Sequence, residues 1–482
     1  MSYLLLINTN TLRPRIAPIA FDYLCSVLEQ QKVRFKIFDL SFERKGWSKK
    51  LAELIRKDPP FLIGITLRNL DDCYFLSGKF LAGKVRWLVQ FIKKNFNIPI
   101  VVGGVGYSLA PRALLEYLGA DYGIWGDGEE ALLALAKVLQ KGQEPRQADI
   151  QGLVGKGFAL CSRAMADLRN FSFQRSFVQN SLYFKLGGQI GIETKRGCDG
   201  RCIYCADLVS KGRKFRLREP ESVADELEEL VRKGIWAFHL CDSEFNRPYS
   251  HCMSVLEEIC KRGLNRKIKL YGYFSPARFD NDLAQLYARA GGAGICFGAD
   301  SGAEEVLESL RRDHTPDDLA RAVSLCKKHK IRVMLDLLLG APKESKKTLR
   351  KTISLMKKIK PDRVGLSWGV RVFAYTDLEK KLRKQEQIPD GIIGAWQNNP
   401  ELIYPVFYLE PSLQKDGLAY LEGLIGSDPC FFLPSAQKKS QDYNYSQNLF
   451  LERLIKKGAR GAYWAILLEE SEKRQERQRS RK

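Results

Sequence analysis

Histidine is scarce in this chain. There are four histidines among 482 residues, and the first of them is His239. Long hydrophobic runs are missing as well, because no apolar stretch is long enough to span a bilayer. The N-terminal residues Met1–Asn8 lack the basic region and the cleavage site of a signal peptide. We therefore expect a cytoplasmic protein without a transmembrane segment.

The chain also lacks a disulfide framework. Twelve cysteines in a chain of this length are too sparse for one, and most of them stand alone in the sequence. We expect these single cysteines to be small buried apolar residues in a reducing compartment. Hydrophobic residues make up 45% of the chain, a value typical of a folded protein with two or three domains.

Acidic residues are outnumbered, and the formal net charge is +22. Basic residues lie along the expected helix faces and gather in the last ten residues, 473–482. A nucleic acid or an anionic lipid is one interpretation, and a solvated surface with a frayed tail is the other. Aromatic residues do not alternate with the basic ones as stacking platforms would. We therefore expect that nucleic acid is not a partner.

Short β-rich runs alternate with amphipathic helices through residues 1–145, which we predict to be the first domain. The expected strands are Tyr3–Thr9, Val33–Phe38, Phe61–Thr66, Ile98–Val102 and Tyr122–Trp125. The expected helices are Ile19–Gln31, Ser48–Lys57, Gly78–Phe96, Ala110–Leu118 and Glu129–Gln140. This alternation predicts a doubly wound, Rossmann-like parallel sheet whose ligand lies beyond the carboxyl ends of the strands. Residues 146–187 are predicted to be a linker region.

A second alternating series occupies residues 188–380. Its expected strands are Ile190–Thr194, Ala237–Cys241, Lys269–Phe274, Ala293–Gly298, Arg332–Leu338 and Arg363–Ser367. Six consecutive βα units predict a partial (β/α)6 barrel. Residues 381–482 are less periodic and rich in aromatic residues, so we expect a mixed C-terminal segment beside the substrate that ends in the basic tail. The predicted fold class is α/β throughout.

Three cysteines stand together after the first strand of the second series. Cys198, Cys202 and Cys205 have the spacing C-x3-C-x2-C. Three thiolates can bind three irons of a [4Fe-4S] cluster and leave the fourth iron open, whereas a closed zinc site needs a fourth ligand. No second cysteine pair follows at the spacing of a zinc knuckle. The triplet therefore predicts an open iron–sulfur cluster.

The aromatic residue before the third cysteine, Tyr204, completes a motif that resembles the radical S-adenosylmethionine superfamily. The resemblance implies that the cluster binds S-adenosylmethionine at its open iron and that the ends of the following strands contact this cosubstrate. Relatives usually have Glu-Ser where this chain has Asp300 and Ser301. A carboxylate there can accept hydrogen bonds from ribose hydroxyls. The implied contact residues are Tyr204, Asp242, Ser243, Glu244, Ser275, Arg278, Asp300, Ser301, Gly340, Pro342 and Glu344.

Two glycine-rich turns follow strands of the first domain, at residues 103–106 and 126–129. They are neither a P-loop nor a dinucleotide fingerprint, because no Gly-Lys-Ser/Thr follows and the first expected strand has no glycine turn. Together they resemble the cobalamin-binding domain that precedes many radical S-adenosylmethionine enzymes. The resemblance implies cobalamin contacts at Thr66, Asn69, Leu70, Asp71, Gly103, Gly104, Val105, Gly106, Gly126, Asp127, Gly128 and Glu129.

No histidine of this domain can serve as a lower axial ligand of cobalt, because the domain contains none. Arg68 stands there in the run Arg68-Asn69-Leu70-Asp71, which resembles the tryptophan C-methyltransferase branch. That resemblance implies that Arg68 approaches the lower face of the corrin. A cation there disfavours a sixth ligand on cobalt and eases methyl transfer. The alternative is a surface ion pair between Arg68 and Asp71 or Asp72.

The combined motifs predict a cobalamin-dependent enzyme that methylates an unactivated or weakly nucleophilic carbon. A ring-forming or rearranging enzyme with the same cofactors is the alternative, and a nucleic-acid-binding iron–sulfur protein is a remote one. The substrate is a small molecule or a peptide that no motif identifies. Tyr443 and Tyr445 are candidate substrate-side catalytic residues. An electron donor such as flavodoxin or ferredoxin is the expected protein partner.

Overall fold

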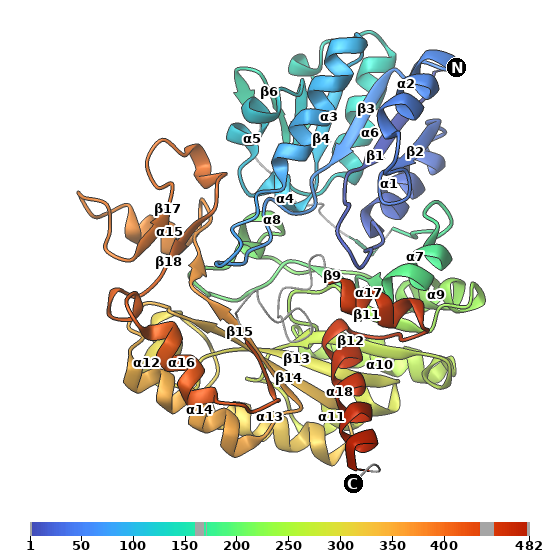
Figure 1. Ribbon diagram of the computed structural model, residues 1–482. Coiled ribbons are helices and arrows are strands. Elements are labelled where there is room, and N and C mark those ends of the chain that lie inside the picture. Colours follow the sequence, from blue (N-terminus) through green and yellow to red (C-terminus); the bar gives the residue numbers. More distant parts are fainter. Residues whose placement is uncertain (1, 160–167, 170, 434–447, 480–482) are drawn as a thin grey trace.

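A computed structural model describes residues 2–159, 168–169, 171–433 and 448–479. The chain forms two α/β lobes that lie one above the other (Figure 1). The first lobe is built on a sheet of seven strands in the order β2-β1-β3-β4-β5-β6-β7. Its parallel strands are β1 (Leu4–Asn8), β2 (Phe35–Asp39), β3 (Leu62–Thr66), β4 (Ile100–Gly103) and β5 (Tyr122–Ile124).

Strand β1 shows why this sheet is covered on both faces. All five of its residues are buried. Leu4 and Leu6 pack into one apolar cluster, and Leu5 and Ile7 pack into another, because successive side chains of a strand point to opposite faces. One face is covered by α1 (Ile19–Gln30) and α6 (Glu129–Gln140), and the other by α2 (Trp47–Lys57), α3 (Ala82–Asn95) and α5 (Pro111–Leu118).

Two details of the first lobe differ from the prediction. Helix α3 begins at Ala82 and not at Gly78, because Gly78 has a φ of +51° and Phe80 pairs with Asp71 in an isolated bridge. The hairpin of β6 (Leu153–Gly155) and β7 (Phe158–Ala159) joins the sheet in antiparallel fashion. The sheet therefore continues past residue 145 into the predicted linker region.

The second lobe is built on a parallel sheet of seven strands in the order β19-β15-β14-β13-β12-β11-β8. Six of them match the predicted strands: β8 (Ile190–Ile192), β11 (Ala237–Leu240), β12 (Lys269–Phe274), β13 (Gly292–Asp300), β14 (Arg332–Leu339) and β15 (Arg363–Trp368). The seventh, β19 (Phe431–Phe432), has two residues, which is too short for a periodicity to predict. Within the described ranges β8 and β19 do not pair, so the barrel is partial, as predicted.

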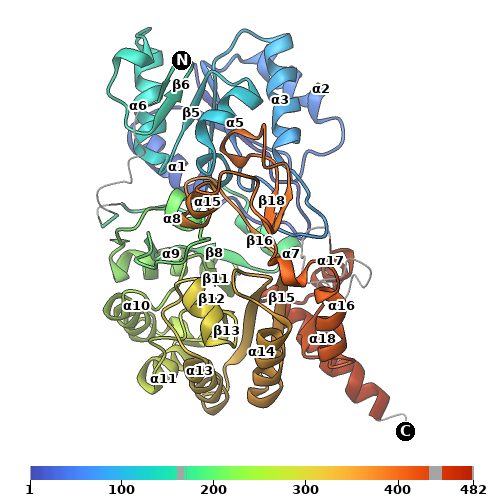
Figure 2. The same cartoon turned by 90° about the vertical axis from the view of Figure 1, so that its left-hand side faces the viewer.

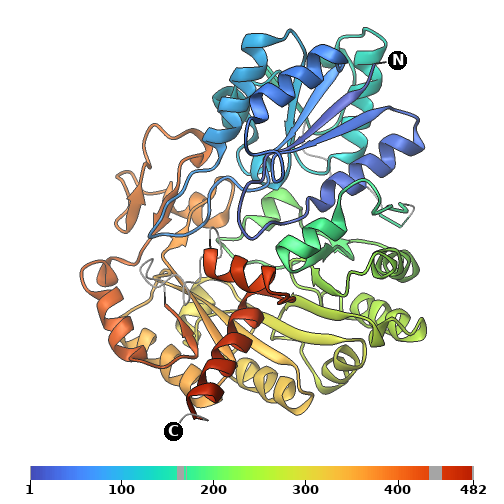
Figure 3. The same cartoon turned by 45° about the vertical axis from the view of Figure 1, so that its right-hand side comes forward.

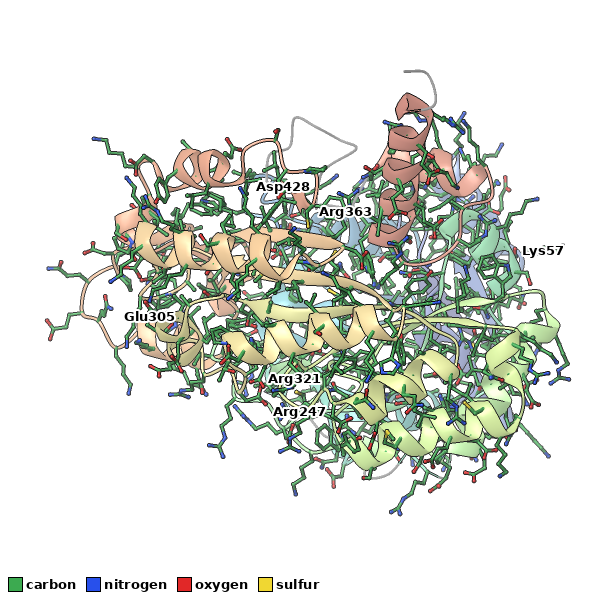
Figure 4. The ribbon with its side chains drawn as sticks, turned by 90° about the horizontal axis from the view of Figure 1, so that it is seen from below. Lys57, Arg247, Glu305, Arg321, Arg363 and Asp428 are labelled. Carbon is green, nitrogen blue, oxygen red and sulfur yellow. The ribbon has the colours of Figure 1, made fainter. Side chains whose placement is uncertain are left out.

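Helices cover the outer side of this partial barrel. They are α9 (Pro220–Arg232), α10 (Tyr249–Lys261), α11 (Asn281–Arg289), α12 (Glu304–Ser309), α13 (Pro316–Lys328) and α14 (Lys346–Ile359). Their outer faces carry charged side chains, among them Glu305 and Arg321 (Figure 4). Glu305 pairs with Lys351 at 2.8 Å across α12 and α14.

The C-terminal residues cover the open inner side of the barrel. Helices α17 (Leu449–Lys456) and α18 (Tyr463–Arg479) lie across the strands (Figure 3). Trp464 of α18 packs with Tyr271, Cys296 and Met334, which point inward from β12, β13 and β14. A small antiparallel sheet of β16 (Val370–Arg371), β18 (Val406–Tyr408) and β17 (Ile392–Gly394) lies between the lobes with α15 (Asp377–Leu382), and α16 (Gly417–Ile425) packs on α14.

A buried ion network joins the two lobes. Arg175, from the segment between them, has no accessible side-chain surface. Its Nε lies 2.8 Å from Asp22 of α1, and its Nη1 donates to Glu226 of α9. Arg218 and Tyr23 donate to the same Glu226. None of the described helices combines the length and the hydropathy needed to cross a membrane.

Candidate functional site

The three predicted cluster cysteines lie on one loop between two short paired strands, β9 (Lys195–Arg196) and β10 (Arg216–Leu217). The sulfurs of Cys198 and Cys202 both lie beside Gly200. A Cβ atom built on Gly200 would be 3.3 Å from Cys198 Sγ and 3.9 Å from Cys202 Sγ. The Gly200 N–H donates to Cys198 Sγ at 3.4 Å. Burial raises the pKa of all three thiols, that of Cys205 to about 12.

The loop suits a cluster better than a single metal ion. In the part of the chain that the structure describes, no three His, Cys, Asp or Glu side chains are placed to hold one ion. A cluster binds each cysteine at a different iron, so its thiolates need not converge on one point. Buried thiols with raised pKa values need the charge of the irons to deprotonate.

Arg312 connects this loop to the barrel rim. Its Nη1 donates to Cys202 Sγ at 2.9 Å, its Nη2 donates to the Gly298 carbonyl at 2.8 Å, and its Nε lies 3.1 Å from Asp300 Oδ2. The Tyr204 hydroxyl donates to Asp300 at 2.6 Å. The predicted residues Tyr204 and Asp300 are therefore brought together beside the cluster loop. The sequence interpretation missed Arg312, because nothing distinguishes it from its neighbour Arg311.

The polar residues after β11 support the loop. Asp242 accepts the N–H of Thr194 at 2.9 Å, and Ser243 donates to Asp207 at 2.6 Å. Glu244 lies 3.3 Å from Arg312 Nη2. Asp242 thus holds the backbone at Thr194, and Ser243 holds the helix α8 (Asp207–Ser210) beside the cysteines. Glu244 lies at the barrel rim beside Arg312.

The remaining predicted contacts of the barrel divide between local turns and exposed positions. Ser301 Oγ forms a hydrogen bond with Thr352 Oγ1 and accepts one from the Ala303 N–H. Glu344 accepts the N–H groups of Gly340 and Ala341, and burial raises its pKa to about 8. Pro342 accepts a hydrogen bond from Ser309, and Ser275 Oγ is buried without a partner among the described residues. Arg278 is exposed.

A cavity of about 220 Å³ lies at the carboxyl ends of β1, β3, β4 and β5. Leu6, Leu24, Val101, Ile124 and Leu132 form its apolar wall. Eight of the predicted cobalamin residues also line it: Thr66, Gly103, Gly104, Val105, Gly126, Asp127, Gly128 and Glu129. An apolar slot at this edge fits the nucleotide tail of a large cofactor.

The other four predicted cobalamin residues do not line this cavity. Leu70 belongs to the apolar core, and Gly106 packs so closely that an added Cβ would lie 2.8 Å from the Asn69 backbone. Asp71 pairs with Arg371 of β16 at 2.9 Å, and both side chains are buried. These positions are fixed by packing between loops.

The carboxylates of Asp127 and Glu129 face the second lobe. Glu129 Oε1 lies 2.7 Å from Arg196 Nη2, and Asp127 lies 3.2 Å from Arg196 and 3.1 Å from Arg216. Arg196 and Arg216 begin and end the cysteine loop. The sequence interpretation assigned these carboxylates to the cofactor and missed both arginines, because their partners lie far away in the chain.

Arg68 extends into the gap between the lobes. Asp71 is held by Arg371, and Asp72 accepts hydrogen bonds from Ser77 and the Lys79 N–H. The predicted alternative, an ion pair of Arg68 with Asp71 or Asp72, is therefore absent among the described residues. The Arg68 side chain is solvent-exposed, and its charge influences Cys241, His239 and Tyr463 of the second lobe. Desolvation by the surrounding protein lowers the pKa of Arg68.

Further polar side chains line the inner side of the barrel below Arg68. His239 and Tyr273 meet edge to face with ring centroids 5.4 Å apart, and Tyr273 is 41% exposed although it lies inside the barrel. Burial and the nearby Arg68 lower the pKa of His239 to about 4, and its Nδ1 has no partner in the described ranges. The available signal was the alternation of His239, in β11, with Cys241, the residue directly after that strand. Tyr443 and Tyr445 lie outside the described residues.

Comparison with known proteins matches both domains. Residues 5–136 match the B12 binding domain and residues 192–356 match the radical SAM superfamily. The chain is 29% identical to tryptophan 2-C-methyltransferase of Streptomyces laurentii, over 95% of each protein. It is 27% identical to anaerobic magnesium-protoporphyrin IX monomethyl ester cyclase of Cereibacter sphaeroides, over 77% of this chain and 61% of that protein.

Two solved structures of TsrM from Kitasatospora setae align with this chain over the full length of both proteins. The structure with tryptophan and the S-adenosylmethionine analogue aza-SAM has a TM-score of 0.91 at 29% identity. The structure with cobalamin and a [4Fe-4S] cluster has a TM-score of 0.89 at 28% identity. These matches confirm the predicted fold class and both resemblances.

Proposed function

This chain is a cobalamin-dependent radical S-adenosylmethionine methyltransferase, and we propose that its methyl acceptor is a carbon of an aromatic, indole-like ring. The observation that carries the proposal is the position of Arg68. It lies in a domain without histidine and reaches toward an inner barrel surface made of aromatic and neutral polar side chains. The similarity to tryptophan 2-C-methyltransferase supports the substrate class.

The residues present fit the expected cofactors. Cys198, Cys202 and Cys205 would hold the [4Fe-4S] cluster, and the apolar cavity at the glycine turns would hold the nucleotide tail of cobalamin. Tyr204, Glu244 and Asp300, with Arg312 between them, would offer hydrogen bonds and charges to the polar groups of S-adenosylmethionine. When bound, these cofactors supply the methyl group and the one-electron chemistry.

The chain's own residues prepare the acceptor. Tyr273 offers exposed aromatic surface against which a planar ring can pack. His239 is neutral at pH 7, because burial lowers its pKa to about 4. Its Nδ1 has no partner in the described part of the chain and can accept a hydrogen bond from a ring N–H. Arg68 has no carboxylate partner among the described residues and can present its charge to a cofactor between the lobes.

The test is methyl transfer from S-adenosylmethionine labelled in its methyl group. The anaerobically reconstituted protein is incubated with L-tryptophan and a set of indoles, and the products are analysed by mass spectrometry. We expect S-adenosylhomocysteine and a product that has gained one labelled methyl group on carbon. The variant Cys205→Ala, which lacks one cluster ligand, is the control for cluster-dependent turnover.

Two results would contradict the proposal. If 5'-deoxyadenosine is the only product of S-adenosylmethionine and the acceptor gains no methyl, the reaction is a ring closure or a rearrangement. If methylation occurs on aliphatic compounds and no indole is bound or methylated, the aromatic substrate class is wrong.

A further inference from the structure

A second surface pocket reaches the cluster loop from outside the barrel. It has a volume of about 260 Å³ and is lined by Cys202 and Cys205. Leu208 and Val209 of α8 form one side, and residues 375–377 and Lys380 of the α15 segment form the other. Figure 2 shows α8 and α15 together on the face turned toward the viewer. Two of the cluster cysteines thus line a pocket at the molecular surface.

An aromatic pair stands at the rim of this pocket, which we name the cluster pocket. The rings of Trp125 and Tyr375 are stacked with centroids 6.0 Å apart and an interplanar angle of 27°. Tyr375 is 37% exposed and has a φ of +65°, a left-handed conformation that a bulky residue rarely adopts. Its hydroxyl donates to Glu401. Strained backbone of this kind persists where the surroundings hold it, and it is common at functional surfaces.

Basic side chains outnumber acidic ones around the cluster pocket. Exposed basic residues at or next to its rim are Arg213, Lys380, Lys381, Arg383 and Lys384. The carboxylates nearby have partners: Asp377 lies 2.9 Å from Arg311 and 3.6 Å from Lys380, Glu379 pairs with Arg383, and Glu401 accepts from the Tyr375 hydroxyl. The exposed side chains of Arg213, Lys381 and Lys384 therefore set the sign of the rim. A basic rim around an exposed aromatic edge is complementary to an acidic protein with an exposed planar group.

We propose that the cluster pocket and its basic rim form the docking surface for an acidic electron carrier of the flavodoxin class. This inference rests on the proposed function, since it supplies the electron that the cluster needs. The reduced flavin of the carrier loses one electron and keeps its proton, and the cluster gains that electron. The Trp125–Tyr375 pair lies between the carrier and Cys202 and Cys205. Helix α18 packs on the inner side of the barrel, whereas the cluster pocket lies at the surface directly beside Cys202 and Cys205.

The test reverses charge at the rim without touching the cysteine loop. Lys380 and Lys384 are exposed and four residues apart, so they share a face of α15 and its following turn. The variant is Lys380→Glu with Lys384→Glu. The matched control is Lys57→Glu with Lys94→Glu, which changes the net charge equally at exposed lysines near the C-terminal ends of α2 and α3. Lys57 lies at the edge of the molecule in Figure 4.

Two readouts are measured: the rate of cluster bleaching by reduced flavodoxin, and the binding of oxidised flavodoxin. For the rim variant we expect a loss of roughly tenfold or more in both, and an unchanged rate with dithionite. The wild-type rate with flavodoxin should fall as salt is raised. Tyr375→Asn, which tolerates the left-handed backbone, should slow bleaching by flavodoxin and leave the iron content unchanged.

Several outcomes would overturn the proposal. They are an unchanged flavodoxin rate in the rim variant, an equal loss in the control variant, or a loss seen with ferredoxin and not with flavodoxin. Failure of the proposed function is distinguishable, because wild-type protein that dithionite reduces but that methylates no acceptor would still report on docking through both readouts.

Discussion

Arg196 Nη2 lies 2.7 Å from Glu129 Oε1, and this contact joins the start of the cysteine loop to the opposite lobe. Both side chains are nearly buried, with 10% and 4% of their surface exposed. Arg196 also contacts Asp127 and Glu193, so one guanidinium gathers three carboxylates from two lobes. The geometry of the cluster loop therefore depends on residues of the cobalamin-binding domain.

Replacing Glu129 by alanine should destabilise the protein and loosen the cluster. Removing one partner of a buried ion pair costs about 3 to 5 kcal/mol, and we expect the lower end, because Asp127 and Glu193 remain beside Arg196. Urea unfolding and iron content after reconstitution measure the two effects. The control is Glu53→Ala, which removes an exposed 4.0 Å pair with Lys49 and should cost less than about 0.5 kcal/mol. Equal losses in both variants would contradict the prediction.

Arg68→Ala should lower the rate of methyl transfer by roughly tenfold or more, equivalent to at least about 1.4 kcal/mol of activation free energy. The reason is the loss of a cation that has no carboxylate partner in the described structure. The cobalamin absorption spectrum should change as well, because a water molecule can take the vacated place. Arg266→Ala, at an exposed arginine of the second lobe that belongs to neither predicted cofactor site, is the matched control. An unchanged spectrum and rate in Arg68→Ala would remove the proposed role.

Arg312→Gln should make the cluster harder to reduce. Arg312 donates to Cys202 Sγ at 2.9 Å, and a charged donor to a cluster sulfur stabilises the reduced, more negative state. An EPR-monitored redox titration should therefore show a more negative midpoint potential. Arg311→Gln changes the same charge at the neighbouring residue, which is exposed and paired with Asp377, and should leave the potential unchanged. A shift of equal size in the two variants would assign the effect to net charge alone.

The protein should lose stability on mild acidification through His314. Burial and the adjacent Arg312 lower the pKa of His314 to about 4, below its ordinary value of 6.5. The unfolded chain then binds this proton first, so the contribution is fully present above pH 6.5 and is lost as the pH falls toward 4. The loss at pH 4 amounts to about 3 kcal/mol. Urea unfolding across this range measures it, and His314→Gln should flatten the slope. An unchanged slope in the variant would contradict the assignment.

The sequence was sufficient where the pattern is local. The buried runs of β1, β3 and β4 and the six barrel strands alternate with amphipathic helices, so the two parallel sheets could be predicted from periodicity. The cysteine triplet has a spacing that few other sites share. The strands β7 and β19 were missed because two residues have no measurable period. The three-residue strand β6 was missed with its hairpin partner, because it does not belong to the strand–helix alternation that revealed the equally short β5 and β8.

Long-range partners could not be predicted. Asp127 and Glu129 follow a glycine turn and look like ligand contacts, yet their carboxylates pair with Arg196 and Arg216, which lie far along the chain. Asp71 is held by Arg371 in the same way. Folding brings Arg312 beside Cys202 and His239 into the range of the Arg68 charge, and the sequence alone does not reveal either proximity.

The buried Arg175 has a consequence for how the molecule moves. Its guanidinium is shared between Asp22 of one lobe and Glu226 of the other, and none of the three side chains has accessible surface. Drawing the lobes apart would leave charged groups without partners before water reaches them, which is strongly unfavourable. The lobes therefore behave as one cooperative unit and not as two jaws on a hinge. Entry of large molecules into the gap between the lobes then depends on the loops at its margin.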